Sequence, residues 1–314
     1  MPEDRRCLIC DSSGPFEFVF SKGDYRLVRC PRCGLVFQDP QPPEDVLSRS
    51  YYHDPEFSQA LLGPLRPITL ERAREKLPLL RSAGAARPGL RVLDVGCSSG
   101  AWLEVAATEG MVATGVEIGE ITAAAARERG LDVRTGTLEE AFPEGSEERF
   151  DLITFWDVLE HLRDPRHELR RAAELLRPGG AVAATFPNVE GWYPRLTYRL
   201  LARPTGVWEH PELPVHMYDF APATARRLFE GTGYDVTALR TMATPFQFYR
   251  ETVLSPDQLG SGQRARLLRL SFEALRLAIY PLARLFRRGN AMFIVASGAV
   301  EAEASSTKLP SSAT

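Results

Sequence analysis

Four cysteines near the N-terminus have the type and spacing of a metal site. Cys7 and Cys10 form one C-x-x-C pair, and Cys30 and Cys33 form a second pair after 19 intervening residues. Each pair can direct two thiolates at one point, and two pairs complete the tetrahedral shell of a zinc ion. Four thiolates leave no position for water, so we expect a structural zinc in a small ribbon over residues 1–45.

The segment RVLDVGCSSGAWLEV contains a glycine turn between an expected strand and an expected helix. Gly96 and Gly100 frame the turn, and Asp94 precedes it. A turn that binds a dinucleotide would read G-x-G-x-x-G, and a carboxylate at the position of Asp94 would repel its pyrophosphate. Glu117 ends the next expected strand, where a carboxylate can accept hydrogen bonds from both ribose hydroxyls. These acids predict a nucleoside ligand that carries a cationic amino-acid arm.

A second polar group consists of Asp157, Glu160 and His161, followed at a distance by His216. At the start of an expected helix, their spacing would place the first three on one face. Two carboxylates and two imidazoles could hold a divalent cation against a substrate hydroxyl. Either histidine could instead act as a metal-free general base. The acids could also serve the architecture, because they complement the dipole of a first helical turn.

Short apolar runs alternate with helical segments from residue 89 to residue 300. This pattern predicts an α/β domain with a parallel sheet, right-handed crossovers and helices on both faces. A proline-rich break ends the ribbon, and a linker with a helix occupies residues 46–88. The polar tail at 301–314 has the composition of a disordered segment.

From Leu90 to Val236 the sequence resembles the class I S-adenosylmethionine-dependent methyltransferases. The resemblance rests on RVLDVGCSSG, on Glu117, and on the segments FDLITFWDVLEHLRDP and LLRPGG. It implies a Rossmann-like sheet and S-adenosylmethionine as cofactor. The contacts that it implies come from Asp94, Gly96, Cys97, Gly100, Glu117, Thr137, Leu138, Phe155 and Trp156.

The resemblance also implies roles for particular residues and shows where this sequence departs from the family pattern. Thr137 and Leu138 would lie beside adenine, although the family often has Asp at the first of these positions. Ser98 replaces the usual middle glycine of the turn. The acid-x-x-Glu-His pattern followed by a distant histidine is similar to RNA 3′-terminal 2′-O-methyltransferases and to O-methyltransferases of ubiquinone synthesis.

Two further segments could contact an acceptor or a surface. Residues 188–219 are rich in aromatic and basic side chains, and they could form a substrate lid or a packed loop. A helical insertion is expected at 246–289, with Leu268, Leu275, Leu282 and Phe286 at helical spacing among many arginines. Residues 264–288 could lie on an anionic membrane, or they could pack the apolar stripe on the core and expose the arginines.

Charge and composition narrow the classes of function that the protein could have. The net charge of the 314 residues is −3, and the ribbon has six basic against eight acidic residues, which argues against nucleic acid as a partner. The N-terminus lacks the apolar region of a secretory signal, so we expect a cytoplasmic protein. We expect a methyltransferase for a small-molecule acceptor, with a hydroxyl of a sugar or other biosynthetic intermediate as the favoured target. An RNA methyltransferase that grips RNA with its ribbon, and a non-enzymatic interaction protein with a vestigial cofactor fold, stay open as alternatives.

Overall fold

The computed structural model describes residues 6–47, 54–243 and 262–298. The polar tail at 301–314 and the first part of the expected insertion, residues 246–261, lie outside these ranges. Within the described ranges, every helix is too short or too polar to cross a membrane.

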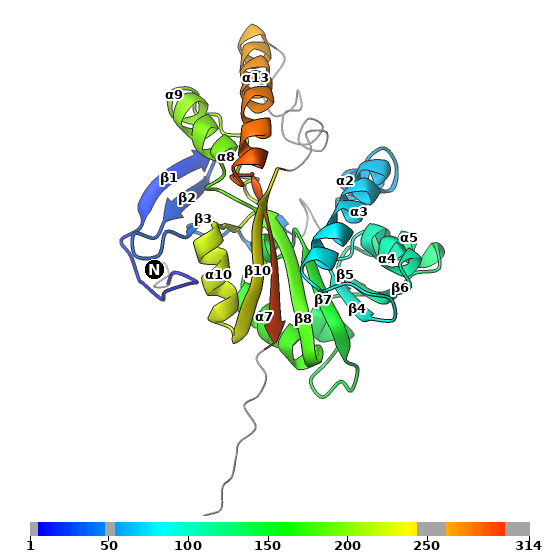
Figure 1. Cartoon of the computed structure of the whole chain (residues 1–314). Helices are drawn as coiled ribbons and strands as arrows, with labels where there is room; N and C mark the ends of the chain where they lie inside the picture. The colour runs from blue at the N-terminus through cyan, green and yellow to red at the C-terminus, as the bar shows by residue number, and fades with distance from the viewer. Residues whose placement is uncertain (1–5, 48–53, 244–261, 299–314) are drawn as a thin grey trace, which may run out of the picture.

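A seven-stranded sheet forms the centre of the protein, in the order β10-β11-β8-β7-β4-β5-β6 (Figure 1). Neighbouring strands from β8 to β6 are parallel, and β11 is antiparallel to both β8 and β10. This arrangement confirms the predicted α/β fold with a mostly parallel sheet. The strands are β4 Arg91–Val95, β5 Val112–Glu117, β6 Asp132–Thr135, β7 Phe150–Trp156, β8 Leu176–Pro187, β10 Tyr234–Met242 and β11 Ala291–Gly298.

Helices cover both faces of this sheet because successive strand residues point to opposite sides. Leu93 faces the apolar cluster that contains α7 (Pro165–Leu175) and α10 (Pro222–Glu230). Val92 faces the cluster that contains α3 (Arg66–Ser82) and α4 (Ala101–Thr108). The remaining helices of residues 44–141 are α1 Glu44–Leu47, α2 Pro55–Leu62, α5 Glu120–Glu128 and α6 Leu138–Ala141.

Two helix boundaries show how local sequence acts. α7 begins at Pro165, because the Asp164 carboxylate accepts hydrogen bonds from the backbone N–H groups of Arg166 and His167, and Pro165 occupies the first helical position. Helix α3 contains Pro78 and continues past it to Ser82. Its apolar face, which includes Leu80, is buried against the sheet, and this packing outweighs the lost backbone hydrogen bond.

The expected ribbon is joined to the rest of the chain by a fourth strand. Strands β1 (Glu17–Lys22), β2 (Tyr25–Arg29) and β3 (Val36–Gln38) form an antiparallel sheet. β3 also pairs with β9 (Tyr218–Asp219), which lies far along the sequence. The ribbon therefore shares its sheet with the segment that follows His216.

The segment after β8 and the long C-terminal helix complete the fold. Residues 192–205 form α8 (Trp192–Thr197), a π-helical turn η3 (Tyr198–Ala202) and α9 (Arg203–Thr205). Helix α13 (Gln263–Leu285) stands beside α8 and projects from the body of the protein (Figure 1).

Candidate active site

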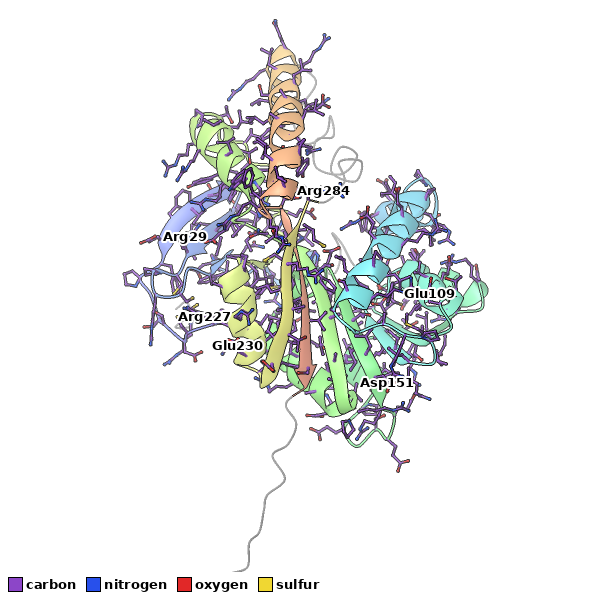
Figure 2. The ribbon with its side chains drawn as sticks, in the orientation of Figure 1. Arg29, Glu109, Asp151, Arg227, Glu230 and Arg284 are labelled. Atoms are coloured by element: carbon purple, nitrogen blue, oxygen red, sulfur yellow. The ribbon has the colours of Figure 1, made fainter. Side chains whose placement is uncertain are left out.

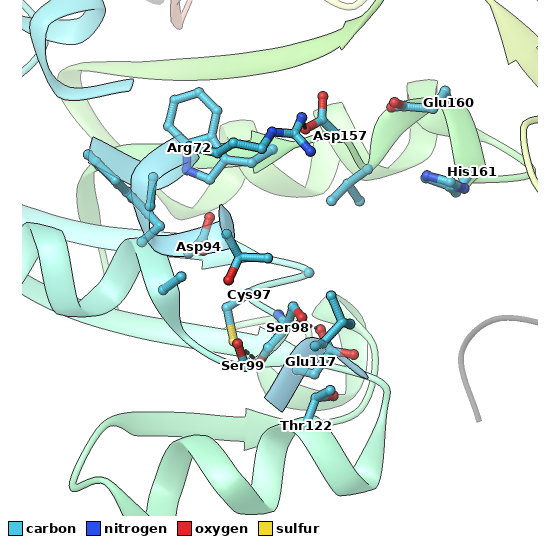
Figure 3. A pocket seen from close by; sticks show the side chains of 18 of the residues that line it. Arg72, Asp94, Cys97, Ser98, Ser99, Glu117, Thr122, Asp157, Glu160 and His161 are labelled. Carbon is cyan, nitrogen blue, oxygen red and sulfur yellow. Dashed lines mark hydrogen bonds and ion pairs between the residues drawn. The ribbon is translucent and has the colours of Figure 1, made fainter. Parts of the chain in front are cut away.

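A cavity of about 300 Å³ opens at the carboxyl ends of the parallel strands. Its described walls come from α2 and α3, from the glycine turn after β4, from the ends of β5 and β7, and from residues 157–161 and 212–216. Figure 3 shows that Asp94, Ser98 and Glu117 lie at one end of this cavity, with Glu160 and His161 toward the other. Parallel α/β sheets bind ligands at this end of their strands.

The glycine turn brings backbone groups close to the cavity. The N–H groups of Gly96 and Cys97 donate to the Val116 carbonyl oxygen at 2.8 and 3.0 Å, which fixes the turn against β5. Gly96 has φ 71°, and a Cβ there would lie 2.7 Å from a methyl group of Val158. Ser98, in the middle of the turn, has φ 50°, a left-handed conformation that costs a non-glycine residue about 1–2 kcal/mol.

Asp94 and Glu117 both line this cavity. Asp94 is 2% exposed, and its Oδ1 accepts a hydrogen bond from Thr154 Oγ1 at 2.7 Å. Burial raises the pKa of Asp94 to about 7, although the Thr154 hydroxyl and the Lys76 ammonium act against the rise. The two carboxylate oxygens of Glu117 accept hydrogen bonds from the N–H groups of Ser98 and Gly119, both at 2.7 Å.

The structure separates the other residues expected at the cofactor into two groups. Cys97 and Trp156 line the cavity, and Gly100 starts α4 at φ 78°. Phe155 and Leu138 instead lie in the apolar core below the sheet, since Phe155 alternates with Trp156 along β7. Thr137 caps α6, and its hydroxyl oxygen accepts a hydrogen bond from the backbone N–H of Glu140. Thr137, Leu138 and Phe155 are not among the described residues that line this cavity, and their contact with the cofactor stays a prediction.

Two cations on α3 line the cavity and were not predicted from the sequence. Arg72 Nη2 lies 2.9 Å from Asp157 Oδ2, and the two side chains point at each other in Figure 3. Lys76 Nζ lies 4.7 Å from the centroid of the Trp156 ring. Burial lowers the pKa of Lys76 to about 8, and the Asp157 carboxylate opposes this effect. The signal in the sequence is the i, i+4 spacing of Arg72 and Lys76, which places both on one face of α3.

At the other end of the cavity, three candidate catalytic residues form one cluster. Ligand atoms of Glu160, His161 and His216 lie within 4.8 Å of one another. The two imidazole rings meet edge to face, with centroids 4.6 Å apart. Glu160 is fully buried, and neither of its carboxylate oxygens has a hydrogen-bond partner among the described residues.

Burial sets the charge states in this cluster. It raises the pKa of Glu160 well above its usual value, and the Asp157 carboxylate adds to the rise. It also lowers the pKa of His161 to about 3 and that of His216 to about 4. Both histidines are therefore neutral at physiological pH, which is the form that binds metal ions.

The carboxylate of Asp157 is not among the ligand atoms of this cluster although it lines the same cavity, so its part in the expected set of four stays a prediction. Asp157 has φ 58°, and its carboxylate pairs with Arg72. Glu160 and His161 lie in a short 3-10 turn over Leu159–His161, so the expected helical face does not exist. Glu212, which the sequence analysis missed, lies beside the cluster, with its Oε2 3.6 Å from Nε2 of His216.

The four ribbon cysteines also come together. Their sulfur atoms lie within 4.8 Å of one another. Cys7 and Cys33 are 3.4 Å apart at sulfur, and Cys10 and Cys30 are 3.6 Å apart. Thiolates that share a tetrahedral zinc are about 3.8 Å apart, so the four residues fit such an ion closely.

The ribbon also holds the backbone beside His216. The side-chain amide of Gln38 donates to the carbonyl oxygens of Pro214 at 2.7 Å and His216 at 2.6 Å. The backbone N–H of Gln38 donates to the Met217 carbonyl oxygen at 2.9 Å. The ribbon thus contacts the candidate site directly through β3.

The order of strands, with β11 antiparallel beside β8, and the cavity above the glycine turn define a Rossmann-like α/β protein of the methyltransferase type. Residues 69–239 match the family described as a methyltransferase domain. This match covers more than half of the chain, and the protein belongs to that family.

Curated relatives resemble the same part of the chain. The ubiquinone biosynthesis O-methyltransferase of Hahella chejuensis is 34% identical over 142 residues, which are 43% of this chain and 55% of that protein. The enzyme of the same name from Caulobacter vibrioides is 37% identical over 137 residues, 40% of this chain and 54% of that protein. The similarity thus spans about half the length of these relatives.

Solved structures support the fold. A magnesium protoporphyrin IX methyltransferase from Synechocystis, with bound SAH, has a TM-score of 0.53 and 15% identity, over 82% of this chain and 100% of that chain. A complex of the Haloferax volcanii Trm112 methyltransferase activator with a methyltransferase described as putative has a TM-score of 0.51 and 15% identity, over 78% of this chain and 98% of that chain. At these identities the likeness shows the fold alone.

Proposed function

We propose that the protein transfers a methyl group from S-adenosylmethionine to a hydroxyl of a small-molecule acceptor, such as a sugar or another biosynthetic intermediate. The observation that carries this proposal is the meeting of Asp94 and Glu117 in one cavity, on either side of the glycine turn. The O-methyltransferase names of the curated relatives support a hydroxyl acceptor.

The residues present fit the cofactor. Ionised Asp94 would bind the ammonium group of the methionine arm. Glu117 would bind the ribose hydroxyls, since it ends β5 and lines the cavity beside the glycine turn. Arg72 and Lys76 add positive charge where the carboxylate of the arm would need it. When bound, the cofactor supplies an activated methyl group, and the protein positions the acceptor in line with it.

We further propose that Glu160, His161 and His216 hold a divalent cation at the acceptor end of the cavity. A buried carboxylate without a hydrogen-bond partner is costly, and a cation would satisfy both of its oxygens. Such a cation would bind the acceptor hydroxyl and make its proton easier to remove. Glu212 lies beside His216, where it can orient the imidazole.

We also propose that Cys7, Cys10, Cys30 and Cys33 bind a structural zinc ion, based on the geometry of their sulfur atoms. A shell of four thiolates supplies folding free energy and has no open position for substrate.

The proposal is tested with purified protein. Calorimetry should show binding of S-adenosylmethionine, and a screen of hydroxyl-bearing acceptors, including nucleotide sugars, should show methyl transfer that a chelator inhibits. Glu117→Gln should weaken cofactor binding, whereas Glu139→Gln, an exposed carboxylate on α6, should not. Absence of cofactor binding to the wild-type protein would refute the proposal. Methyl transfer that is insensitive to chelator would refute the proposed divalent cation and favour a metal-free general base.

A further inference from the structure

Helix α13 exposes an apolar stripe along its outer side. Leu267, Leu270, Leu277 and Leu285 lie three, seven and eight residues apart, which places them on one helical face. Their exposed fractions range from 53% to 79%. Soluble proteins rarely leave such a row of leucines in water without a binding partner.

The opposite face of α13 already has its packing partner. Phe272, Ile279 and Ala283 are buried, and the last two pack with Tyr193 of α8. Arg276, also buried, lies 3.6 Å from Glu209. The helix is thus packed against the protein on one face, and the leucine stripe lies on the other face.

The sequence left open whether this helix lies on a membrane or packs on the core, and the structure shows one packed face and one exposed apolar face. Of the stripe expected at Leu268, Leu275, Leu282 and Phe286, the first two are half-buried and the last two are exposed. The arginines do not occupy the whole outer face, because the leucines share it. The helix therefore has one apolar face toward the protein and a second toward solvent.

Positive charge surrounds the exposed stripe. The following arginines of the helix and its C-terminal end are exposed: Arg264, Arg266, Arg284, Arg287 and Arg288. The acidic residue within α13 is Glu273. Figure 2 shows side chains standing out along the length of α13, with Arg284 labelled near its C-terminal end. Leucine flanked by arginine complements a surface with apolar chains and negative headgroups.

An aromatic pair lies at the base of the helix. The rings of Trp192 and Phe286 are 5.4 Å apart, and both side chains are partly exposed. Aromatic side chains are favoured at the boundary between headgroups and acyl chains. The pair extends the apolar surface from α13 onto α8.

The end of α13 adjoins the candidate active site. The N–H of Trp192 donates to the Arg288 carbonyl oxygen at 2.9 Å, and that of Asn188 donates to the Asn290 carbonyl oxygen at 2.8 Å. Ala291 follows directly and lines the cavity. A surface that holds α13 would therefore also hold one edge of the cavity close to it.

We propose that α13 docks the protein on an anionic phospholipid surface, with Leu267, Leu270, Leu277 and Leu285 in the headgroup region and the flanking arginines on lipid phosphates. The proposal stands independently of methyl transfer. It requires binding at the membrane surface alone.

Co-sedimentation of the full chain with lipid vesicles tests this proposal. Vesicles of phosphatidylcholine and phosphatidylglycerol should bind the protein, vesicles of phosphatidylcholine alone should bind it weakly, and added salt should release it. Leu270→Ser with Leu277→Ser should lower the partition coefficient by at least about tenfold. Arg266→Gln with Arg288→Gln should lower it about fivefold for each charge removed.

Val112→Ser is the matched control, since Val112 is 61% exposed at the start of β5, at the opposite end of the sheet. It should bind vesicles like the wild type. All variants should retain the wild-type melting temperature, which separates lost binding from lost folding. No binding to anionic vesicles at low salt would overturn the proposal. It would also be overturned if the leucine variant bound normally, or if it converted a dimer into a monomer without changing vesicle binding.

Discussion

Asp94 combines a buried, poorly solvated carboxyl group with a proposed role in cofactor binding. Its carboxylate keeps one hydrogen bond, from Thr154, and burial raises its pKa to about 7. In the free protein the group is therefore protonated at mildly acid pH and ionised at mildly alkaline pH. A cationic ligand stabilises the ionised form, so cofactor binding and proton release are coupled.

We expect the affinity for S-adenosylmethionine to fall about tenfold between pH 8 and pH 6, because the ionised fraction of Asp94 falls by that factor across its pKa of about 7. Calorimetry at several pH values measures this change in affinity. Asp94→Asn should bind more weakly and lose this dependence. Because the pKa of Asp94 is raised in the folded protein, its ionisation lowers the free energy of unfolding as the pH rises through about 7. The Asn variant without ligand should therefore melt at a higher temperature than the wild type at pH 8.

Replacing Glu160 with Gln should lower the content of divalent metal at the second site by at least about tenfold and remove the inhibition by chelator, because the substitution removes a proposed ligand. Metal analysis of the purified variant checks this. Asp157→Asn is the control, since Asp157 pairs with Arg72 and lies outside the cluster, so its metal content should stay at the wild-type level. Equal metal content in the wild type and the Glu160 variant would contradict the site.

At the scale of elements, strand β3 connects the ribbon with the candidate site. It pairs with β9, and the buried amide of Gln38 binds the backbone on either side of Val215. Because β9 begins two residues after His216, the ribbon sheet limits where this imidazole can lie. The ribbon therefore acts as a support for the site as well as a fold of its own.

Gln38→Leu should reduce the free energy of unfolding by about 2–4 kcal/mol, since two buried carbonyl oxygens lose their donor. It should also weaken metal binding at His216 and leave the affinity for S-adenosylmethionine near the wild-type value. Denaturant unfolding and calorimetry measure these effects. Gln41→Leu, which loses a hydrogen bond to the Tyr218 hydroxyl in the same segment, should leave metal binding unchanged. Equal metal affinity in both variants would argue against a positioning role for Gln38.

Local sequence was sufficient to predict the sheet and the glycine turn. The short apolar strands and the spacing from Asp94 to Glu117 are both patterns within a few tens of residues. Arg72, Lys76 and Glu212 were missed because their roles depend on packing across the cavity. The helix expected at Asp157 gave way to a left-handed residue and a 3-10 turn, which local spacing did not indicate.

At the scale of the whole molecule, the ribbon is part of the main core. Cys7 and Cys30 belong to the same buried cluster as Leu169 of α7 and Leu228 of α10. Pairing between β3, at residues 36–38, and β9, at residues 218–219, joins segments that are far apart in the sequence. Such contacts leave no periodic pattern in the sequence, and the ribbon at residues 1–45 was predicted as a separate unit for that reason.

Cys30→Ser should therefore destabilise the entire protein. We expect loss of about one zinc per chain and a lower melting temperature for the whole structure in a single transition, because the ribbon and the main sheet share one core. Metal analysis and circular dichroism during heating test this. Cys97→Ser, at the fifth cysteine, should keep the zinc. Two separate transitions in the Cys30 variant, with the main sheet melting at the wild-type temperature, would show that the ribbon is independent.

The pairing of β3 with β9 also bears on synthesis. Gln38 and the histidine whose carbonyl it binds are 178 residues apart, so the ribosome must make most of the chain before this contact can form. The first three ribbon strands leave the exit tunnel early, with one edge unpaired. Release of a nascent chain before residue 218 would leave that edge open to other polypeptides.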